Sequence, residues 1–224
     1  MEDYLRKIVK MQKAGEPVGI YSACTGNEIV LEACMRHAKE TGTVLLIEST
    51  ANQVDQYGGY TGMKPADFVQ MCEKLSECVG LPMDRIILGG DHLGPLTFAH
   101  YEEKKAMEEA EELIRQYVMA GFTKIHIDTS MKVASDDPEE RLSDEIIARR
   151  GAVLAKTAED AYKKLKKERP DAPHPVYIVG SEVPIPGGSQ DEVDTGVQVT
   201  KVSDFQATVK AFQKAYEDQG LKDA

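Results

Sequence analysis

The sequence predicts an α/β fold in which short buried strands alternate with helices and pair into a parallel sheet. Five times along the chain, a short apolar strand runs into a polar or charged residue and then into a helical segment. Strands that alternate with helices in this way are typical of βαβ units. We expect the five strands at Val18–Ser22, Val44–Glu48, Ile86–His92, Ile125–Asp128 and Val176–Glu182.

Apolar residues at helical spacing predict six helices around these strands. Glycines follow several of the predicted ends, as is typical of helix C-termini, and Pro65 suits the first turn of a helix. A Ser203-x-x-Gln206 capping box predicts the start of the last helix. The expected helices are residues 1–14, 27–39, 65–79, 102–120, 143–169 and 203–220.

The size and charge of the chain limit what it can do. Its 224 residues are enough for one domain with a substantial core, which we expect to span residues 1–224. With 27 basic and 38 acidic residues, the net charge is −11, which repels nucleic-acid phosphates and anionic lipid. We therefore expect neither nucleic acid nor a membrane surface as a partner.

Several features favour a cytoplasmic location. The first residues carry charges every few positions and have no apolar segment typical of a signal peptide. No apolar run approaches the ~20 residues that a membrane helix needs. The four cysteines form no C-x-x-C pair, and Cys34 and Cys72 sit in amphipathic helical patterns, which suits small core residues of a reducing compartment.

Polar residues stand where the predicted strands end. In a barrel of βα units the chemistry collects at the carboxyl ends of the strands. Two long strand-to-helix segments, residues 49–64 and 183–202, lie at the same edge, and long ordered loops tend to be functional. We therefore expect one shared cleft of catalytic, ligand-binding or metal-binding residues. Its candidate members are Glu48, Asn52, Gln53, Asp91, His92, Asp128, Glu182, Gly187 and Gly188.

The densest motif is Gly89-Gly-Asp-His-Leu-Gly-Pro95. A neutral imidazole is a common zinc ligand, and a carboxylate beside it can transfer protons or orient a ligand. The alternative is an aspartate cap beside a hydrogen-bonded histidine. Because neighbouring residues of a strand point to opposite faces, Asp91 and His92 can both enter the cleft only if the strand ends between them.

Two further motifs carry weaker signals. In Ile125-His-Ile-Asp128, His126 shares a face with Asp128 one layer below it, and we expect a hydrogen-bonded core residue there rather than a ligand. After Glu182, prolines stiffen the chain, and Gly187-Gly188 allow close approach of a ligand such as phosphate. The sequence contains no G-x-x-x-x-G-K-[ST] motif, so a P-loop kinase is not supported.

The spacing of the strands leaves two architectures open. Successive strands start about 40 residues apart, so a closed barrel of eight units would need well over ~300 residues. The fifth unit is the last in this sequence. The pattern therefore predicts either an open sheet of five units or the N-terminal part of a larger barrel.

Four stretches, taken in order, resemble a known family. They are Glu48-Ser-Thr-Ala-Asn-Gln-Val-Asp-Gln-Tyr-Gly-Gly-Tyr-Thr-Gly-Met63, Ile86-Ile-Leu-Gly-Gly-Asp-His-Leu-Gly-Pro95, Ala120-Gly-Phe-Thr-Lys-Ile-His-Ile-Asp128 and Gly180-Ser-Glu-Val-Pro-Ile-Pro-Gly-Gly188. In sequence, order and spacing they resemble the non-catalytic subunit of class II D-tagatose-1,6-bisphosphate aldolase, the GatZ/KbaZ-like family. The resemblance covers nearly the whole chain.

The resemblance implies a (β/α)8 TIM-barrel fold, here a partial barrel of about five βα units with parallel strands in sequential order. Class II aldolases use zinc to polarise the ketose carbonyl. Asp91 matches their proton-shuttling aspartate and His92 a zinc ligand, while Glu182 and Gly187-Gly188 match a fifth-strand glutamate and its glycine loop.

The chain also departs from the pattern of these enzymes. Val183 and Pro184 stand where the enzymes carry a Gly-His, and the later strands with a further histidine are absent. One matching histidine does not make a zinc site. Members of the family are also about twice as long as this chain.

We therefore expect a helper subunit that stabilises a catalytic aldolase chain in galactitol and tagatose 6-phosphate catabolism. Its partners would be that chain and a sugar phosphate, it would be oligomeric, and it would have little or no lyase activity alone. One alternative is a ketose aldolase or epimerase in its own right, using Asp91, His92 and Glu182 with zinc or another divalent metal. Another is an inactive fragment whose open edges pair with a second copy or a missing half.

Overall fold

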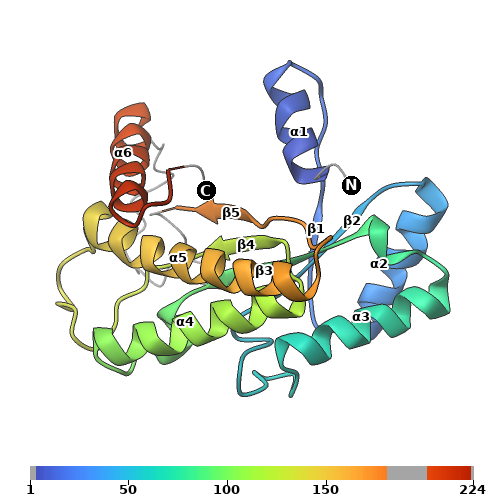
Figure 1. The fold of residues 1–224 in the computed structure, drawn as a ribbon, viewed down its shortest axis with the longest axis horizontal. Helices are drawn as coiled ribbons and strands as arrows, with labels where there is room; N and C mark the ends of the chain where they lie inside the picture. The colour runs from blue at the N-terminus through green and yellow to red at the C-terminus, as the bar shows by residue number, and fades with distance from the viewer. Residues whose placement is uncertain (1–3, 181–200, 223–224) are drawn as a thin grey trace, which may run out of the picture.

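A computed structural model describes residues 4–180 and 201–222. It contains a five-stranded sheet in which every neighbouring pair is parallel and the strands follow one another in chain order (Figure 1). This confirms the predicted sequential, parallel arrangement. The strands are β1 (Ser22–Cys24), β2 (Leu45–Thr50), β3 (Ile86–Leu93), β4 (Lys124–Ile127) and β5 (Val176–Val179).

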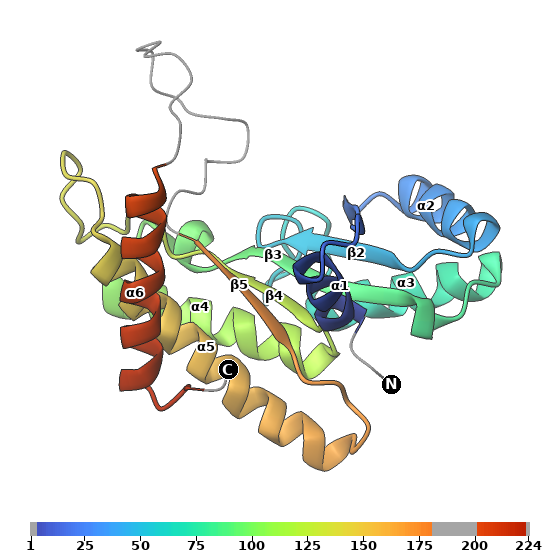
Figure 2. The same ribbon diagram turned by 90° about the horizontal axis from the view of Figure 1, so that it is seen from above.

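Six α-helices surround the sheet in the described residues. Helices α3, α4 and α5 lie along one side of the sheet, whereas α1 lies on the other side (Figures 1 and 2). Short 3-10 helices at Met83–Arg85 and Pro95–Phe98 flank β3. The α-helices are α1 (Tyr4–Lys13), α2 (Glu28–Thr41), α3 (Pro65–Val79), α4 (Glu103–Ala120), α5 (Asp144–Glu168) and α6 (Val202–Asp218).

Most boundaries agree with the sequence analysis to within two residues, but the first strand and the end of the last strand do not. Strand β5 ends at Val179, and its predicted end at Glu182 lies outside the described residues. Strand β1 begins at Ser22, because only Ser22–Cys24 pair with β2. The apolar run before it does not join the sheet, and Tyr21 is 46% exposed. The capping-box prediction was also wrong. Helix α6 starts at Val202, which places Ser203 in the first turn, where its hydroxyl bonds the side chain of Asp204.

Alternation along the strands gives the sheet two chemically different faces. Leu45, Ile47, Ile125 and Ile127 are almost completely buried toward the helices. On this side the Tyr117 hydroxyl of α4 lies 3.0 Å from the Ser49 hydroxyl at the end of β2. On the opposite face β4 carries the polar residues Lys124 and His126, and β2 carries Leu46 followed by Glu48. The helix-facing side is therefore the hydrophobic core, and the other side is free to carry a polar site.

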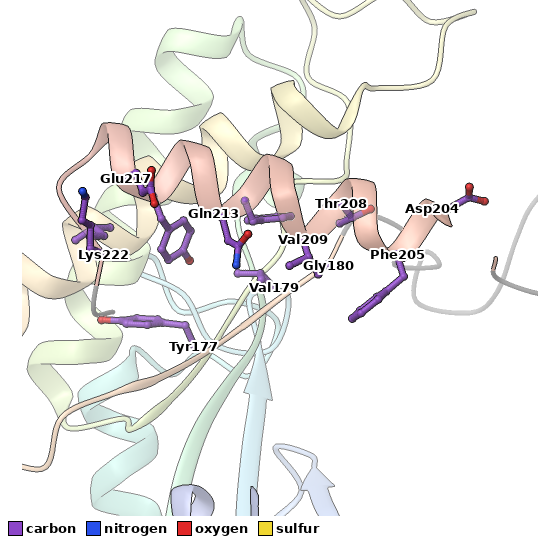
Figure 3. Close-up of a pocket in the computed structure, with 13 residues that line it drawn as sticks. Tyr177, Val179, Gly180, Asp204, Phe205, Thr208, Val209, Gln213, Glu217 and Lys222 are labelled. Carbon is purple, nitrogen blue, oxygen red and sulfur yellow. The ribbon is translucent and has the colours of Figure 1, made fainter. Parts of the chain in front are cut away.

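Beyond β5 the described residues leave a groove that has both apolar and polar side chains on its walls. This groove of about 790 Å³ lies between β5 and α6, lined by Tyr177 and Val179 on the strand and by Phe205 and Val209 on the helix (Figure 3). Phe205 is 63% exposed. In a closed barrel the next βα unit would cover such an edge. The sheet described here is open.

No helix in the described part of the chain is long and apolar enough to cross a membrane.

Gly94 offers a test of how tightly the ends of β3 and β4 approach. A side chain there would fall on the carbonyl oxygen of Asp128, a backbone atom that cannot turn away. We expect Gly94→Ala to lower the free energy of unfolding by about 2–3 kcal/mol through this overpacking. The measurement is urea denaturation.

Gly19→Ala is the matched control, because a side chain at Gly19 meets no atom within 4 Å. Its free energy of unfolding should change by less than about 0.5 kcal/mol. Equal denaturation midpoints for the two variants would contradict the close approach of Gly94 to β4.

Candidate functional site

A β-bulge at the end of β3 brings Asp91 and His92 to the same face. Between two paired positions, Gly90 with Ile125 and Leu93 with Ile127, β3 uses one residue more than β4. His92 takes up the extra residue with a φ of 50°, in the left-handed region. The expectation that the strand must end between Asp91 and His92 was therefore wrong. The strand continues to Leu93, and the bulge re-aims His92.

Five side chains form a continuous polar chain across the sheet. The Lys124 ammonium group pairs with Glu48, which also accepts a hydrogen bond from the Ser22 hydroxyl. Lys124 Nζ lies 3.5 Å from Asp91 Oδ1, and His126 Nδ1 lies 2.7 Å from the same oxygen. Charges from β2, β3 and β4 are thus paired with one another.

A second pair stands nearer the carboxyl edge. His92 Nδ1 lies 2.8 Å from Asp128 Oδ2. The backbone N–H and the hydroxyl group of Ser130 both donate to the other oxygen of Asp128. His92 is therefore oriented by a carboxylate that is itself fixed by the following loop. We call the seven side chains of these two groups the polar centre: Ser22, Glu48, Asp91, His92, Lys124, His126 and Asp128.

The pairing shifts the pKa values in the polar centre. Burial alone would raise the pKa of Asp91, but the hydrogen bond from His126 and the charge of Lys124 outweigh it and hold the pKa at about 2. The hydrogen bond to Asp128 raises the pKa of His92. Beside the centre, burial and then the charge of Asp91 raise the pKa of the Cys24 thiol to about 12. Asp91 is thus ionised, and Cys24 is a neutral thiol.

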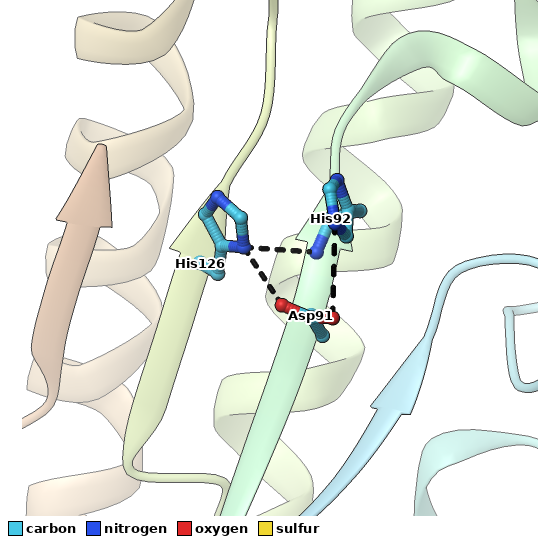
Figure 4. A group of neighbouring side chains, drawn as sticks. All are labelled: Asp91, His92 and His126. Atoms are coloured by element: carbon cyan, nitrogen blue, oxygen red, sulfur yellow. Dashed lines mark hydrogen bonds and ion pairs between the residues drawn. The ribbon is translucent and has the colours of Figure 1, made fainter. Parts of the chain in front are cut away.

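Three residues of the centre could hold a metal ion. Asp91, His92 and His126 each offer one ligand atom, and these atoms lie within 4.8 Å of one another (Figure 4). The pairing of His92 with Asp128 is the kind of outer contact that orients histidine ligands. Two imidazoles and a carboxylate are donors that zinc accepts. The Lys124 ammonium group, however, already shares the Asp91 carboxylate.

A buried arginine fixes the loop that follows Asp128. Arg150 of α5 is fully buried. Its guanidinium group bonds both carboxylate oxygens of Asp136, at 2.6 and 2.8 Å, and Glu103 of α4 at 2.7 Å. A bidentate arginine–carboxylate pair is among the strongest hydrogen-bonded contacts in proteins. It ties the loop between β4 and α5 to two helices and so supports the position of Asp128.

The structure brings together part of the predicted set. Glu48, Asp91, His92 and Asp128 lie in or beside one network. Asn52 is exposed, and the side-chain oxygen of Gln53 accepts from the Thr50 backbone N–H within its own loop. Their predicted substrate-binding role stays a prediction. The other three predicted residues, Glu182, Gly187 and Gly188, lie outside the described residues.

The sequence analysis missed Lys124 and Ser22 and assigned His126 to the core. His126 is hydrogen-bonded, as expected, but to Asp91 within the polar centre. A signal was present in the sequence, since Lys124, His126 and Asp128 alternate with two isoleucines. That alternation places all three on one face of β4.

A family model and two curated relatives that match this chain carry nearly the same description. The sequence model of a family described as "D-tagatose-1,6-bisphosphate aldolase subunit GatZ/KbaZ-like" matches residues 5–224. Two curated relatives, from Salmonella agona and Salmonella heidelberg, are named "D-tagatose-1,6-bisphosphate aldolase subunit GatZ". Each is 44% identical over 220 residues, which cover 98% of this chain and 50% of the relative.

A solved structure shares the fold. It is described as a probable tagatose 6 phosphate kinase from Sinorhizobium meliloti 1021. It superposes with a TM-score of 0.76 at 38% identity, over 92% of this chain and 46% of that one. The chain thus spans about half the length of the relatives that it matches.

The pairing of His92 with Asp128 predicts a pH dependence of stability with a definite sign. The folded pKa of His92 lies above its ordinary value of 6.5. The stabilisation is therefore fully present below that value and is lost as the pH rises through the folded pKa. The difference in Tm between the chain and its His92→Asn variant should be larger at about pH 5.5 than at about pH 8.5.

Asparagine tolerates the left-handed backbone, so this variant does not add strain at position 92. Asp128→Asn serves as the matched variant, because it removes the charge that raises the pKa of His92 and should weaken the same pH dependence. A His92→Asn difference that grows toward alkaline pH would contradict the assignment.

Proposed function

The chain belongs to the GatZ/KbaZ-like family of D-tagatose-1,6-bisphosphate aldolase subunits, and we propose that it acts as a helper subunit. In this role it stabilises and activates a separate catalytic class II aldolase, a lyase, in galactitol and tagatose 6-phosphate catabolism. The word "subunit" in the names of its relatives supports a partner chain. The four free cysteines suit the reducing cytoplasm, where we place this activity.

The ionisation state of Asp91 is the observation that most supports the helper role. Asp91 matches the residue that shuttles a proton in class II aldolases. General acid–base catalysis works best with a pKa near the operating pH. The pKa of Asp91 is about 2, because His126 and Lys124 hold the carboxylate ionised. A carboxylate with so low a pKa is a weak base, which favours a structural role for the polar centre.

The open β5–α6 groove supports an assembled state. Its apolar side chains would be covered by further polypeptide, and burying such surface stabilises association. We propose an oligomer with a catalytic aldolase chain as the functional form. A sugar phosphate remains the proposed small-molecule ligand.

A metal-dependent ketose aldolase or epimerase is the second candidate. The grouping of Asp91, His92 and His126 favours it, because the donor types suit zinc. The charge around these donors does not fit a divalent cation, since Lys124 already pairs with Glu48 and approaches Asp91.

An assay with tagatose-1,6-bisphosphate separates the candidates. We expect the zinc-supplemented chain alone to show no turnover above background. Adding it to a catalytic aldolase subunit, or co-expressing the two, should raise the activity or soluble yield of that subunit several-fold. The chain and an Asp91→Ala variant are assayed side by side.

Zinc-dependent turnover by the chain alone that disappears in Asp91→Ala would replace the helper role with the enzyme role. Unchanged activity and yield of the catalytic subunit would favour the inert fragment instead.

A further inference from the structure

We propose that Lys124 is a built-in cation that keeps zinc out of the polar centre. Its ammonium group supplies the positive charge that the carboxylates of the centre need, so that no divalent ion is bound at Asp91, His92 and His126. The inference rests on the proposed non-catalytic role of this centre and explains how the role is maintained.

The backbone register provides a place for this lysine. Glu48 on β2 pairs with Gly89 on β3, and Gly89 pairs with Lys124 on β4, so the three residues form one row across the sheet. A Cβ atom at Gly89 would lie 2.8 Å from Glu48 Oε1 and 3.1 Å from Lys124 Cδ. The missing side chain at Gly89 therefore leaves the space through which Lys124 crosses β3 to reach Glu48.

The row is also buried and charge-matched. The side chain of Lys124 is 12% exposed and that of Glu48 is 5% exposed. Buried charges are found paired because an unpaired one is costly. One ammonium group between Glu48 and Asp91 partly neutralises two carboxylates at once.

The same ammonium group opposes a metal ion. Zinc bound to Asp91 would share that carboxylate with Lys124, whose nitrogen lies 3.5 Å from Asp91 Oδ1. Two cations at such short range repel each other strongly in a site that water screens poorly. If the lysine is removed, Glu48 and Asp91 face two imidazoles with no cation among them. The two carboxylates and two imidazoles would then attract a zinc ion.

Calorimetric titration with zinc chloride tests this inference. The chain itself should show no zinc binding that depends on Asp91. Lys124→Met keeps the length of the side chain and removes its charge. We expect it to bind zinc at least about 100-fold more tightly than the chain, and zinc should raise its Tm. Lys124→Arg keeps the positive charge and should gain no affinity.

A double variant, Asp91→Asn with Lys124→Met, shows whether the gained site is the polar centre. It should lose the gain, because Asp91 is the carboxylate ligand. If Lys124→Met does not fold without zinc, Glu48→Gln with Lys124→Met removes both members of the buried pair and should still gain zinc affinity. Circular dichroism checks the fold of each variant.

Two results would overturn the inference. One is zinc binding by the unaltered chain that Asp91→Asn abolishes. The other is a folded variant without Lys124 that gains no affinity for zinc. All of these titrations use the chain alone, whereas the helper role is read from a partner's activity, so either proposal can fail without the other.

Discussion

Burying the ammonium group of Lys124 costs free energy unless carboxylates surround it, and much of the site follows from meeting that requirement. Glu48 comes from the strand on the far side of β3 and Asp91 from β3 itself, so the charge pairs link three strands. The lysine can reach Glu48 only because position 89 has no side chain. The register of β2, β3 and β4 is thus coupled to the electrostatics of the polar centre.

The bulge in β3 adds the pair of His92 and Asp128 to the polar centre. A regular strand would turn His92 toward the helices, where the core is apolar. The extra residue instead directs His92 to Asp128, which the following loop holds in place. Asp91 and His92, which resemble the proton shuttle and a metal ligand of class II aldolases, are therefore present but bound to internal partners. Their pairing inside the polar centre is consistent with the proposed non-catalytic role of this chain.

Periodicity in the sequence was enough to predict the parallel order of the strands and most helix boundaries, because apolar spacing reflects burial directly. It also indicated that polar residues gather at the carboxyl ends. Periodicity did not predict the features of the structure that depend on contacts between strands. Alternation could not foresee that a bulge re-aims His92, and no local signal showed that the run before Ser22 lacks a strand partner. Lys124 could have been found from the alternation in β4, but its partners come from other strands.

The most direct measurement is a crystal structure of the unaltered chain grown with zinc chloride, with diffraction collected at the zinc absorption edge. We expect no anomalous peak among Asp91, His92 and His126, and density for the Lys124 ammonium group against Glu48. An anomalous peak bound by these three residues, with Lys124 turned away from Glu48, would contradict the central role given to the lysine.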